Sequence, residues 1–439
     1  MIKKLIVSLC LGFLFHTGFS QHIDKEKLDS YFEALEGSDK FYGSVAVVKN
    51  GQIVYTKSIG YADIESKTKA DKESKYRIGS ISKTFTSVLI LKAIEEKKIN
   101  LETTLNSFFP SIKNAEKITI SHLLSHRSGI HNFTNDAEYL EWYTQAKTEQ
   151  EMIELIAKGG SDFEPNSKAD YSNANYVLLS YILEKVYKKP YADILQEKII
   201  QVVNLKNTYV GKKINLKNKE CNSYSYSTAW EKENETDMTI PMGAGNIVST
   251  PSDLAIFSSA LFHHKIISAQ TVDAMTTLNE RFGYGIFQMP FDDKKSFGHT
   301  GGIDGFSSVF GFFASDDIGF SIISNANNYN INTVTLVVLS AIFDKAYEIP
   351  NFKSYTLSSE DLDPYLGVYA DASFPLKITI SKNGNVLMAQ ATGQGAFSLE
   401  ASEKNIFKFD QAGIVLEFKP ENKTMTLKQG GGVFTLTKE

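Results

Sequence analysis

Strand-like runs at both ends of a long helical stretch constrain how this chain can fold. The first two runs lie within 42–63 and flank Asn50-Gly51, a dipeptide that favours two-residue hairpin turns. Apolar residues at helical spacing then dominate from Ser80 to about residue 200. Strand-like runs return at 281–289, 306–314 and 318–326. This order predicts one sheet that is built from both ends of a domain and covered by helices.

A second change of pattern marks the end of that domain. Ser315-Asp316-Asp317 joins two of the runs as a hairpin connection, so we expect the sheet to be antiparallel. From about residue 350, short runs alternate with Asn-Gly, Glu-Asn and Gly-Gly-Gly turns. We therefore predict a first domain at 21–349, in which helices pack on an antiparallel sheet. An antiparallel β-barrel or sandwich follows at 350–439.

The first twenty residues have the pattern of a secretory signal peptide. Lys3 and Lys4 precede an apolar run from Leu5 to Phe15, and small residues follow at Gly18 and Ser20. We expect cleavage after Ser20 and a periplasmic or extracellular mature protein. The apolar run is too short to anchor the mature chain across a bilayer.

Composition narrows the classes of partner. Cleavage would remove two lysines and no acidic residue, which takes the net charge from −5 to −7. This balance, without a Lys/Arg cluster, argues against a nucleic-acid partner. Cys221 would be the only cysteine left, so no internal disulfide is expected. The apolar run at 334–343 is too short to span a membrane and predicts a buried helix.

Two Ser-x-x-Lys matches compete for a chemical role. Ser66 and Lys69 lie in a polar, charged stretch that predicts a solvated loop. Ser80 and Lys83 instead stand where an amphipathic helix begins, and residues three apart share one face of a helix. A lysine that is desolvated there could lose its proton and act as a base toward the hydroxyl. Taken alone, the pair is better explained as a helix cap and a solvated surface charge, because short motifs often match by chance.

Two further segments favour the chemical interpretation. Tyr171-Ser172-Asn173 stands at the start of another predicted helix, and a tyrosine beside an ammonium can pass a proton to a leaving group. His299-Thr300-Gly301-Gly302 lies at the end of one predicted strand, where glycines let a substrate approach the strand edge. Each segment also has a structural explanation: an aromatic residue at the core edge, and a histidine bonded to a turn.

Taken in order, these three segments resemble the signature motifs of serine β-lactamases and penicillin-binding proteins. The branch that the chain resembles is the class C β-lactamase-like group, which also includes DD-peptidases, D-aminopeptidases and esterases. The stretches 118–130 and 243–257 are similar to this branch as well. The resemblance covers roughly residues 25–345. It implies a three-layer α/β (α+β) β-lactamase-like fold, in which helices flank an antiparallel sheet and a helical subdomain is added. For the C-terminal β-domain we expect a lipocalin-like barrel.

The resemblance implies a role for each residue. Ser80 would be the nucleophile that forms an acyl-enzyme, Lys83 its base, and Tyr171 the proton shuttle to the leaving group. Asn173 would hold Lys83 and contact the substrate amide. The backbone N–H groups of Ser80 and Gly302 would form the oxyanion hole. The strand edge that pairs with substrate would consist of His299, Thr300 and Gly301. No cofactor and no metal is expected.

The chain departs from the family pattern at His299. β-Lactamases and DD-peptidases usually carry a lysine there, a cation that attracts the substrate carboxylate, whereas histidine is mostly neutral at pH 7. We therefore expect an exported serine hydrolase of peptide, amide or ester bonds, with D-amino-acid peptides or related small substrates. β-Lactamase activity should be weak or absent. In relatives, appended barrels are thought to restrict the active-site entrance or mediate assembly, so self-association is a further expectation.

Other classes of function were weighed against this one. His122 and His126, at i and i+4, could bind zinc from one helix face, but no carboxylate or cysteine cluster supplies further ligands. An α/β-hydrolase would need Gly-x-Ser-x-Gly, which the chain lacks. The remaining alternative is a non-catalytic binding or sensor protein with the same fold. Such a protein would be expected to have lost Ser80 or Lys83.

Overall fold

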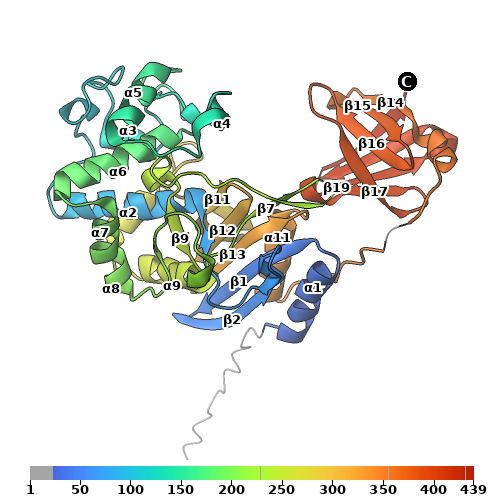
Figure 1. Cartoon of the computed structure of the whole chain (residues 1–439), viewed down its shortest axis with the longest axis horizontal. Helices are drawn as coiled ribbons and strands as arrows, with labels where there is room; N and C mark the ends of the chain where they lie inside the picture. The colour runs from blue at the N-terminus through green and yellow to red at the C-terminus, as the bar shows by residue number, and fades with distance from the viewer. Residues whose placement is uncertain (1–22, 228, 354, 431) are drawn as a thin grey trace, which may run out of the picture.

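The computed structural model describes residues 23–227, 229–353, 355–430 and 432–439. The signal peptide predicted for residues 1–20 lies outside them. Figure 1 shows a body of helices and sheet that one segment connects to a separate C-terminal β-barrel. Within the described residues, no helix is long and apolar enough to cross a membrane.

The central sheet joins the two ends of the first domain. Its strand order is β10-β11-β12-β13-β1-β2, and every pair on this path is antiparallel. The strands are β1 (Phe41–Lys49), β2 (Gln52–Ile59), β10 (Phe287–Phe291), β11 (Lys294–Ile303), β12 (Phe306–Phe313) and β13 (Ile318–Asn327). β1 pairs with β13 along its whole length, from Phe41 opposite Asn327 to Lys49 opposite Ile318. The predicted antiparallel sheet built from both ends is confirmed.

Short strands extend this framework. The hairpin of β7 (Tyr224–Tyr226) and β8 (Trp230–Lys232) joins the sheet through a parallel pair between β7 and β13. A small sheet has the order β5-β9-β6, from Tyr76–Arg77, Ile247–Ser249 and Tyr209–Val210. β3 (Tyr61–Asp63) pairs with β4 (Thr68–Lys69).

Helices cover both faces of the sheet, which makes three layers. Val45 and Val47 of β1 pack in one apolar cluster with α1 (Lys25–Gly37) and α11 (Ile331–Ile342). Ala46 and Val48 point the other way and contact Ala255 of α9 (Pro251–Phe262). Because side chains alternate across a strand, β1 needs apolar residues on both faces, and its run of buried residues follows.

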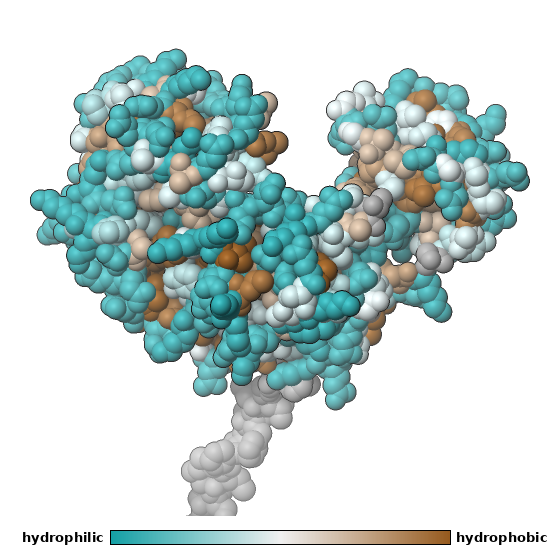
Figure 2. Space-filling view, in the orientation of Figure 1, coloured by the Kyte–Doolittle hydropathy of each residue, from teal (hydrophilic) through white to brown (hydrophobic). Residues whose placement is uncertain are grey.

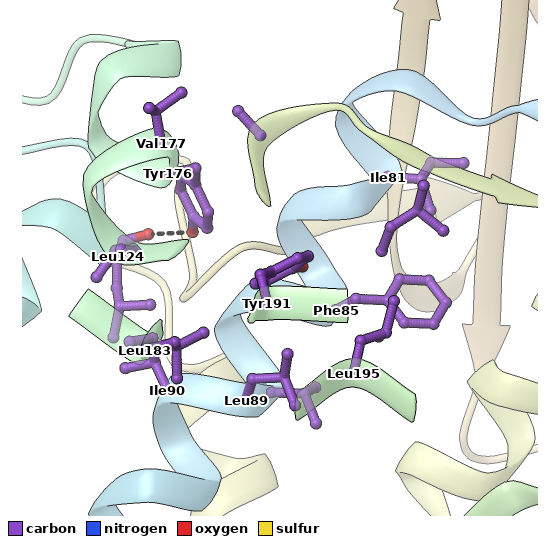
Figure 3. Packing of buried hydrophobic residues seen from close by; sticks show 14 of the residues in the cluster. Ile81, Phe85, Leu89, Ile90, Leu124, Tyr176, Val177, Leu183, Tyr191 and Leu195 are labelled. Atoms are coloured by element: carbon purple, nitrogen blue, oxygen red, sulfur yellow. Dashed lines mark hydrogen bonds between the residues drawn. The ribbon is translucent and has the colours of Figure 1, made fainter. Parts of the chain in front are cut away.

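The helical subdomain is organised around α2 (Ser82–Glu95), which is buried on nearly every side. Figure 3 shows Phe85 and Leu89 of α2 facing Tyr191 and Leu195 of α7 (Tyr191–Leu195). Tyr176 of α6 (Asn173–Tyr187) donates its hydroxyl to the Leu124 carbonyl at 2.8 Å. The other helices are α3 (Ile120–Leu124), α4 (Tyr139–Trp142), α5 (Glu149–Gly159), α8 (Gln201–Val203) and α10 (Ala269–Thr276). A buried α2 fixes the position of the residues at its N-terminus.

The strand expected at 281–289 is shorter than predicted and begins at Phe287. Gly285 has φ +67°, and its carbonyl accepts a hydrogen bond from Thr84 Oγ1 of α2 at 2.8 Å. Phe282 N and Tyr284 N donate to the carbonyls of Asn279 and Met275. The segment before Phe287 therefore turns against α2, because its glycines allow a close approach that an extended strand would not make.

The C-terminal domain is a closed barrel, not a sandwich. Its order is β14-β15-β16-β17-β18-β19-β20-β21, with β21 pairing back to β14. The strands are β14 (Gly367–Asp371), β15 (Phe374–Asn383), β16 (Val386–Ala391), β17 (Phe397–Glu403), β18 (Ile406–Phe409), β19 (Ile414–Lys419), β20 (Thr424–Gln429) and β21 (Gly432–Lys438). Alternate residues of these strands form its apolar core, as in Ile378, Ile380, Leu416 and Phe418. The predicted barrel is confirmed.

The barrel contacts the first domain through a small polar interface. Lys40 is 5% exposed, and its Nζ lies 2.8 Å from Glu400 Oε2 and 3.0 Å from Asp410 Oδ2. Burial alone would lower the pKa of Lys40, but the two carboxylates outweigh it and raise that pKa. Gln411 Nε2 donates to the Tyr226 carbonyl at 3.1 Å. Figure 2 shows the barrel and the helical part standing on either side of a hollow.

Candidate active site

Three segments that are far apart in the sequence meet at the N-terminus of α2. Ser80 lies in a 3-10 turn, η1 (Gly79–Ile81), and α2 begins two residues later than expected, at Ser82. Lys83 is therefore in the first turn of the α-helix, with Ser80 in the turn that precedes it. Ser80 is half-buried, whereas Lys83 has no exposed surface.

Lys83 makes three short polar contacts. Its Nζ lies 3.0 Å from Ser80 Oγ, 2.7 Å from Asn173 Oδ1 and 2.8 Å from the Ala244 carbonyl oxygen. Burial holds the pKa of Lys83 well below its usual value. A neutral amine has two N–H donors, which suit the two carbonyl-type oxygens, and one lone pair, which faces the Ser80 hydroxyl. The arrangement can accept a proton from Ser80.

Tyr171 lies two residues before α6 and completes this group. Lys83 Nζ lies 4.9 Å from the centroid of its ring. Burial raises the pKa of Tyr171, and its hydrogen bond with Ser80 opposes that shift. The phenol is therefore protonated at neutral pH, with its hydroxyl near Ser80 and its ring beside Lys83.

Asn173, the first residue of α6, is held in one orientation. Its Oδ1 accepts from Lys83, while its Nδ2 donates to Thr134 Oγ1 at 3.0 Å and to Asn132 Oδ1 at 3.3 Å. Its backbone N–H also donates to Asn132 Oδ1, at 2.9 Å. Because the amide oxygen must face Lys83, this network orients the lysine as well.

The end of β11 forms an open strand edge beside Ser80. β10 pairs with β11 only from Phe291 opposite Lys294 to Phe287 opposite Gly298, so residues 299–303 extend beyond it. Thr300 and Gly302 are exposed. A Cβ atom at Gly301 would lie 2.1 Å from the Ile78 carbonyl oxygen, and Gly79 has φ +50°. Both glycines are needed for this close approach of β11 to the turn that holds Ser80.

His299 is a neutral group in this site. It is 2% exposed and lies against Phe287, with ring centroids 4.5 Å apart. Burial, together with the charge of a protonated Lys83, lowers the pKa of His299 to about 3. The imidazole hydrogen-bonds to the Thr300 carbonyl through Nδ1. Position 299 therefore carries no positive charge at pH 7.

The second Ser-x-x-Lys match has a different environment. Ser66 Oγ bonds to the Asp63 carboxylate, and Lys69 Nζ bonds to Glu36 Oε1 at 2.7 Å. Ser66 and Lys69 lie in exposed turn and strand positions. The pair thus belongs to the solvated surface, as its sequence indicates.

His122 and His126 accept hydrogen bonds from different backbone N–H groups. His122 Nδ1 accepts from Thr119 N at 3.3 Å, whereas His126 Nδ1 accepts from Ser172 N at 3.2 Å. Across the described ranges, no three His, Cys, Asp or Glu side chains are grouped so that they could hold a metal ion. His126 instead stacks on Tyr171, with centroids 4.4 Å apart, and burial keeps the pKa of His126 well below its usual value.

Some neighbours of the site were not identified from the sequence. His126 supports the Tyr171 ring, and the Ala244 carbonyl binds Lys83. Arg77 and Asp304 form a buried ion pair beneath the turn and the strand end. The similarity of 243–257 to the family pointed to the region of Ala244, but a backbone carbonyl has no signature of its own.

A cavity of about 1150 Å³ lies beside the site. It is lined by Met242, which shares the turn η6 (Met242–Ala244) with the carbonyl that binds Lys83. Its wall also includes Tyr143 and the charged residues Lys212, Glu233 and Asp237.

Comparisons with known proteins identify the family of the chain. The family model for β-lactamases matches residues 28–335. The teichoic acid D-alanine hydrolase of Staphylococcus aureus is 26% identical over 285 residues, which covers 63% of this chain and 68% of that protein. The non-catalytic alternative loses its support, since the chain matches a named hydrolase and keeps Ser80 and Lys83.

Two solved structures share the fold. The D-amino acid amidase from Ochrobactrum anthropi SV3 aligns with TM-score 0.63 and 23% identity, over 73% of this chain and 99% of that one. The octameric penicillin-binding protein homologue from Pyrococcus abyssi aligns with TM-score 0.67 and 22% identity, over 94% of this chain and 100% of that one. The match to the family model covers most of the first domain, and the chain therefore belongs to the β-lactamase family of serine hydrolases.

Proposed function

We propose that the chain is an exported hydrolase that forms an acyl-enzyme on Ser80 and cleaves ester or amide bonds of D-amino-acid derivatives. The observation that carries the proposal is the Lys83 side chain, which is buried without a carboxylate partner and lies 3.0 Å from Ser80 Oγ. A lysine in this state can act as a base at neutral pH.

The proposed reaction has two steps, acylation of Ser80 and hydrolysis of the acyl-enzyme. Ser80 Oγ attacks the substrate carbonyl carbon while its proton passes to Lys83 Nζ. Tyr171 gives a proton to the leaving oxygen or nitrogen, regains one from Lys83, and the bond to the leaving group breaks. Water then attacks the acyl-enzyme, and the same groups return the proton to Ser80 Oγ. The products are a carboxylic acid and an alcohol or amine.

Binding groups surround the reacting carbonyl in this scheme. The backbone N–H groups of Ser80 and Gly302 would stabilise the negative oxygen of the tetrahedral intermediate. The open edge of β11, from His299 to Gly301, would pair with the substrate backbone. Asn173 would orient Lys83 and contact the substrate amide.

The substrate class rests on two considerations. The named relatives act on D-alanine linked to teichoic acid and on amides of D-amino acids. In this chain the neutral His299 offers no fixed cation for a substrate carboxylate. We therefore propose substrates without a free carboxylate at that position, and weak or absent β-lactamase and carboxypeptidase activity.

The leader predicted at residues 1–20 supports export to the periplasm or the extracellular space. The octameric state named for the Pyrococcus abyssi homologue supports self-association as part of the proposal. The C-terminal barrel, which we assign to residues 350–439, would provide the additional contact surface.

The experiment is a substrate panel measured on the wild type and on Ser80→Ala. It includes nitrophenyl esters, D-aminoacyl anilides, D-Ala-D-Ala peptides and nitrocefin. We expect the wild type to turn over esters or D-aminoacyl anilides much faster than D-Ala-D-Ala peptides or nitrocefin, and Ser80→Ala to turn over none. Equal activity in the variant would refute the acyl-enzyme on Ser80.

A further inference from the structure

The two proposed oxyanion donors lie on backbone segments that are pressed together. Ser80 follows Gly79 in η1, and Gly302 stands at the end of β11. A Cβ atom at Gly79 would lie 2.7 Å from the Gly302 carbonyl oxygen, and one at Gly301 would lie 2.1 Å from that of Ile78. The relative position of the two N–H groups therefore depends on how these two segments are held.

A buried ion pair connects the residues that flank these segments. Arg77 is three residues before Ser80, and Asp304 is two residues after Gly302. Arg77 Nη1 lies 2.8 Å from Asp304 Oδ2, and the two side chains are 2% and 1% exposed. The backbone of Arg77 is itself fixed by pairing with Val248 of β9. The ion pair thus joins a fixed strand to the end of β11.

Thr236, from a third segment of the chain, contacts both members of the ion pair. Arg77 Nη1 also donates to the Thr236 carbonyl at 3.0 Å. Asp304 Oδ1 accepts from Thr236 N at 3.0 Å and from Thr236 Oγ1 at 2.6 Å. Both oxygens of the carboxylate are therefore engaged, and the side chain has one defined orientation.

Arg77 has a second carboxylate partner, Glu235, which is more exposed than Asp304. Glu235 Oε2 lies 2.9 Å from Arg77 Nη2, but its side chain is 25% exposed. It also accepts from Ile214 N at 2.8 Å, and it lies far along the chain from both oxyanion donors. Glu235 neutralises the guanidinium without connecting it to β11.

Burying an ion pair costs desolvation energy, and an apolar pair of similar size is often at least as stable. Retention of such a pair beneath the site suggests a purpose other than stability. We propose that Arg77 and Asp304 are positioning residues that set the distance between the N–H groups of Ser80 and Gly302. This rests on the proposed function, because it requires an acyl-enzyme on Ser80.

The test compares Asp304→Asn with Glu235→Gln, which remove one negative charge each from the same arginine. In the full chain, we expect Asp304→Asn to lower kcat for a nitrophenyl ester by about 10- to 100-fold, a smaller loss than removal of an oxyanion donor causes. KM should change less than twofold. The inhibition constant of a boronic acid, which mimics the tetrahedral intermediate, should rise in parallel with the loss of kcat. Glu235→Gln should keep kcat within twofold.

Labelling of Ser80 by a fluorescent phosphonate distinguishes failure of the proposed function from failure of the positioning role alone. A wild type that is not labelled overturns both the proposed function and this inference. A wild type that is labelled, with Asp304→Asn labelled equally fast, overturns the positioning role alone. The same conclusion follows if Asp304→Asn and Glu235→Gln lose equal activity. If Asp304→Asn does not fold, as judged by circular dichroism, Arg77→Lys replaces it with the same expected outcome.

Discussion

Lys83 Nζ lies 3.0 Å from Ser80 Oγ and has no carboxylate among its polar contacts. A lysine at the surface keeps its charge because water solvates it. Lys83 has no exposed surface, and the oxygens that contact its Nζ are neutral. The cost of burying a charge then favours the free amine. The chemistry proposed for the chain follows from this relationship.

Replacement of the nucleophile is the most direct prediction. Ser80→Ala should abolish hydrolysis of every substrate found and also labelling by a phosphonate, because Ser80 Oγ is the serine or threonine hydroxyl that hydrogen-bonds to Lys83 Nζ among the described residues. Ser66→Ala is the matched control, since Ser66 belongs to the same sequence pattern but bonds to Asp63. It should retain wild-type rates. Similar losses in the two variants would show that the serine was wrongly assigned.

The pH dependence should report the titration of Lys83. Its pKa lies well below the usual 10.5, so the free amine, the active base, persists to lower pH than for an exposed lysine. Activity should rise with pH through this lowered pKa. Lys83→Arg, which cannot lose its proton, should lower kcat by about 10²- to 10⁴-fold at every pH.

Lys92→Arg serves as the control for Lys83→Arg. Lys92 lies on the same helix, but its side chain is 31% exposed and pairs with Glu95. It should keep both the rate and the pH profile of the wild type. A profile in Lys83→Arg that matched the wild type would remove Lys83 from the mechanism.

Patterns in the sequence predicted the large elements well. β1 and β13 carry long apolar runs that only a sheet covered on both faces can bury, so their pairing could be anticipated. The C-terminal β-domain was predicted from a different pattern, a series of short apolar runs separated by turn sequences. The start of β10 at Phe287 was not predicted, because Gly285 turns toward α2 through tertiary contacts with Thr84. Local apolar content does not record such contacts.

The site also contains residues that the sequence predicted and residues that it did not. Ser80, Lys83, Tyr171, Asn173 and residues 299–302 were singled out because each lies in a short motif. Ala244 contributes only a carbonyl oxygen, and His126 acts through ring stacking on Tyr171. Neither contact depends on spacing along the chain. The pairing of Arg77 with Asp304 joins residues 227 positions apart and also leaves no local pattern.

A cation at position 299 should change substrate preference. His299→Lys would place an amine with an unperturbed pKa of about 10.4 at the open edge of β11, where the wild type has a neutral imidazole, so the side chain there would be protonated far more readily. We expect KM to fall for substrates with a free carboxylate, such as D-Ala-D-Ala peptides, and to stay the same for nitrophenyl esters. His299→Gln, a neutral replacement, is the control. Unchanged KM values in His299→Lys would separate this position from substrate recognition.

The buried imidazole should also affect stability in acid. The folded-state pKa of His299 is about 3, whereas an unfolded histidine has a pKa near 6.5, so the unfolded chain binds more protons between these values. The contribution of His299 to the free energy of unfolding should therefore decrease as pH falls below about 6.5. Relative to His299→Gln, the wild type should lose about 2 kcal/mol between pH 7 and pH 5.

This comparison needs urea unfolding of both proteins at pH 7 and pH 5. Other groups, His126 among them, titrate in both proteins and cancel in the difference. A difference that stays constant between the two pH values would mean that the pKa of His299 is the same in the folded and the unfolded state, and that burial does not keep the imidazole neutral. A wild type that instead gained stability relative to His299→Gln as pH fell would mean that His299 is protonated in the folded protein. Position 299 would then be a cation, and the substrate preference proposed above would fail with it.

The interface between the two domains should depend on Asp410. Its carboxylate is 14% exposed and lies 3.0 Å from the buried Nζ of Lys40, whereas Glu400, the other partner, is 63% exposed. Asp410→Asn leaves Lys40 with a weaker, solvent-screened partner. We expect the barrel to separate from the first domain and residues 344–353, which are largely exposed, to be cut faster by trypsin. Glu439→Gln is the control. Glu439 forms an exposed ion pair with Lys377, and both residues belong to the barrel domain, so this pair does not bridge the two domains. Equal cleavage rates in the wild type and Asp410→Asn would show that the ion pair does not hold the domains together.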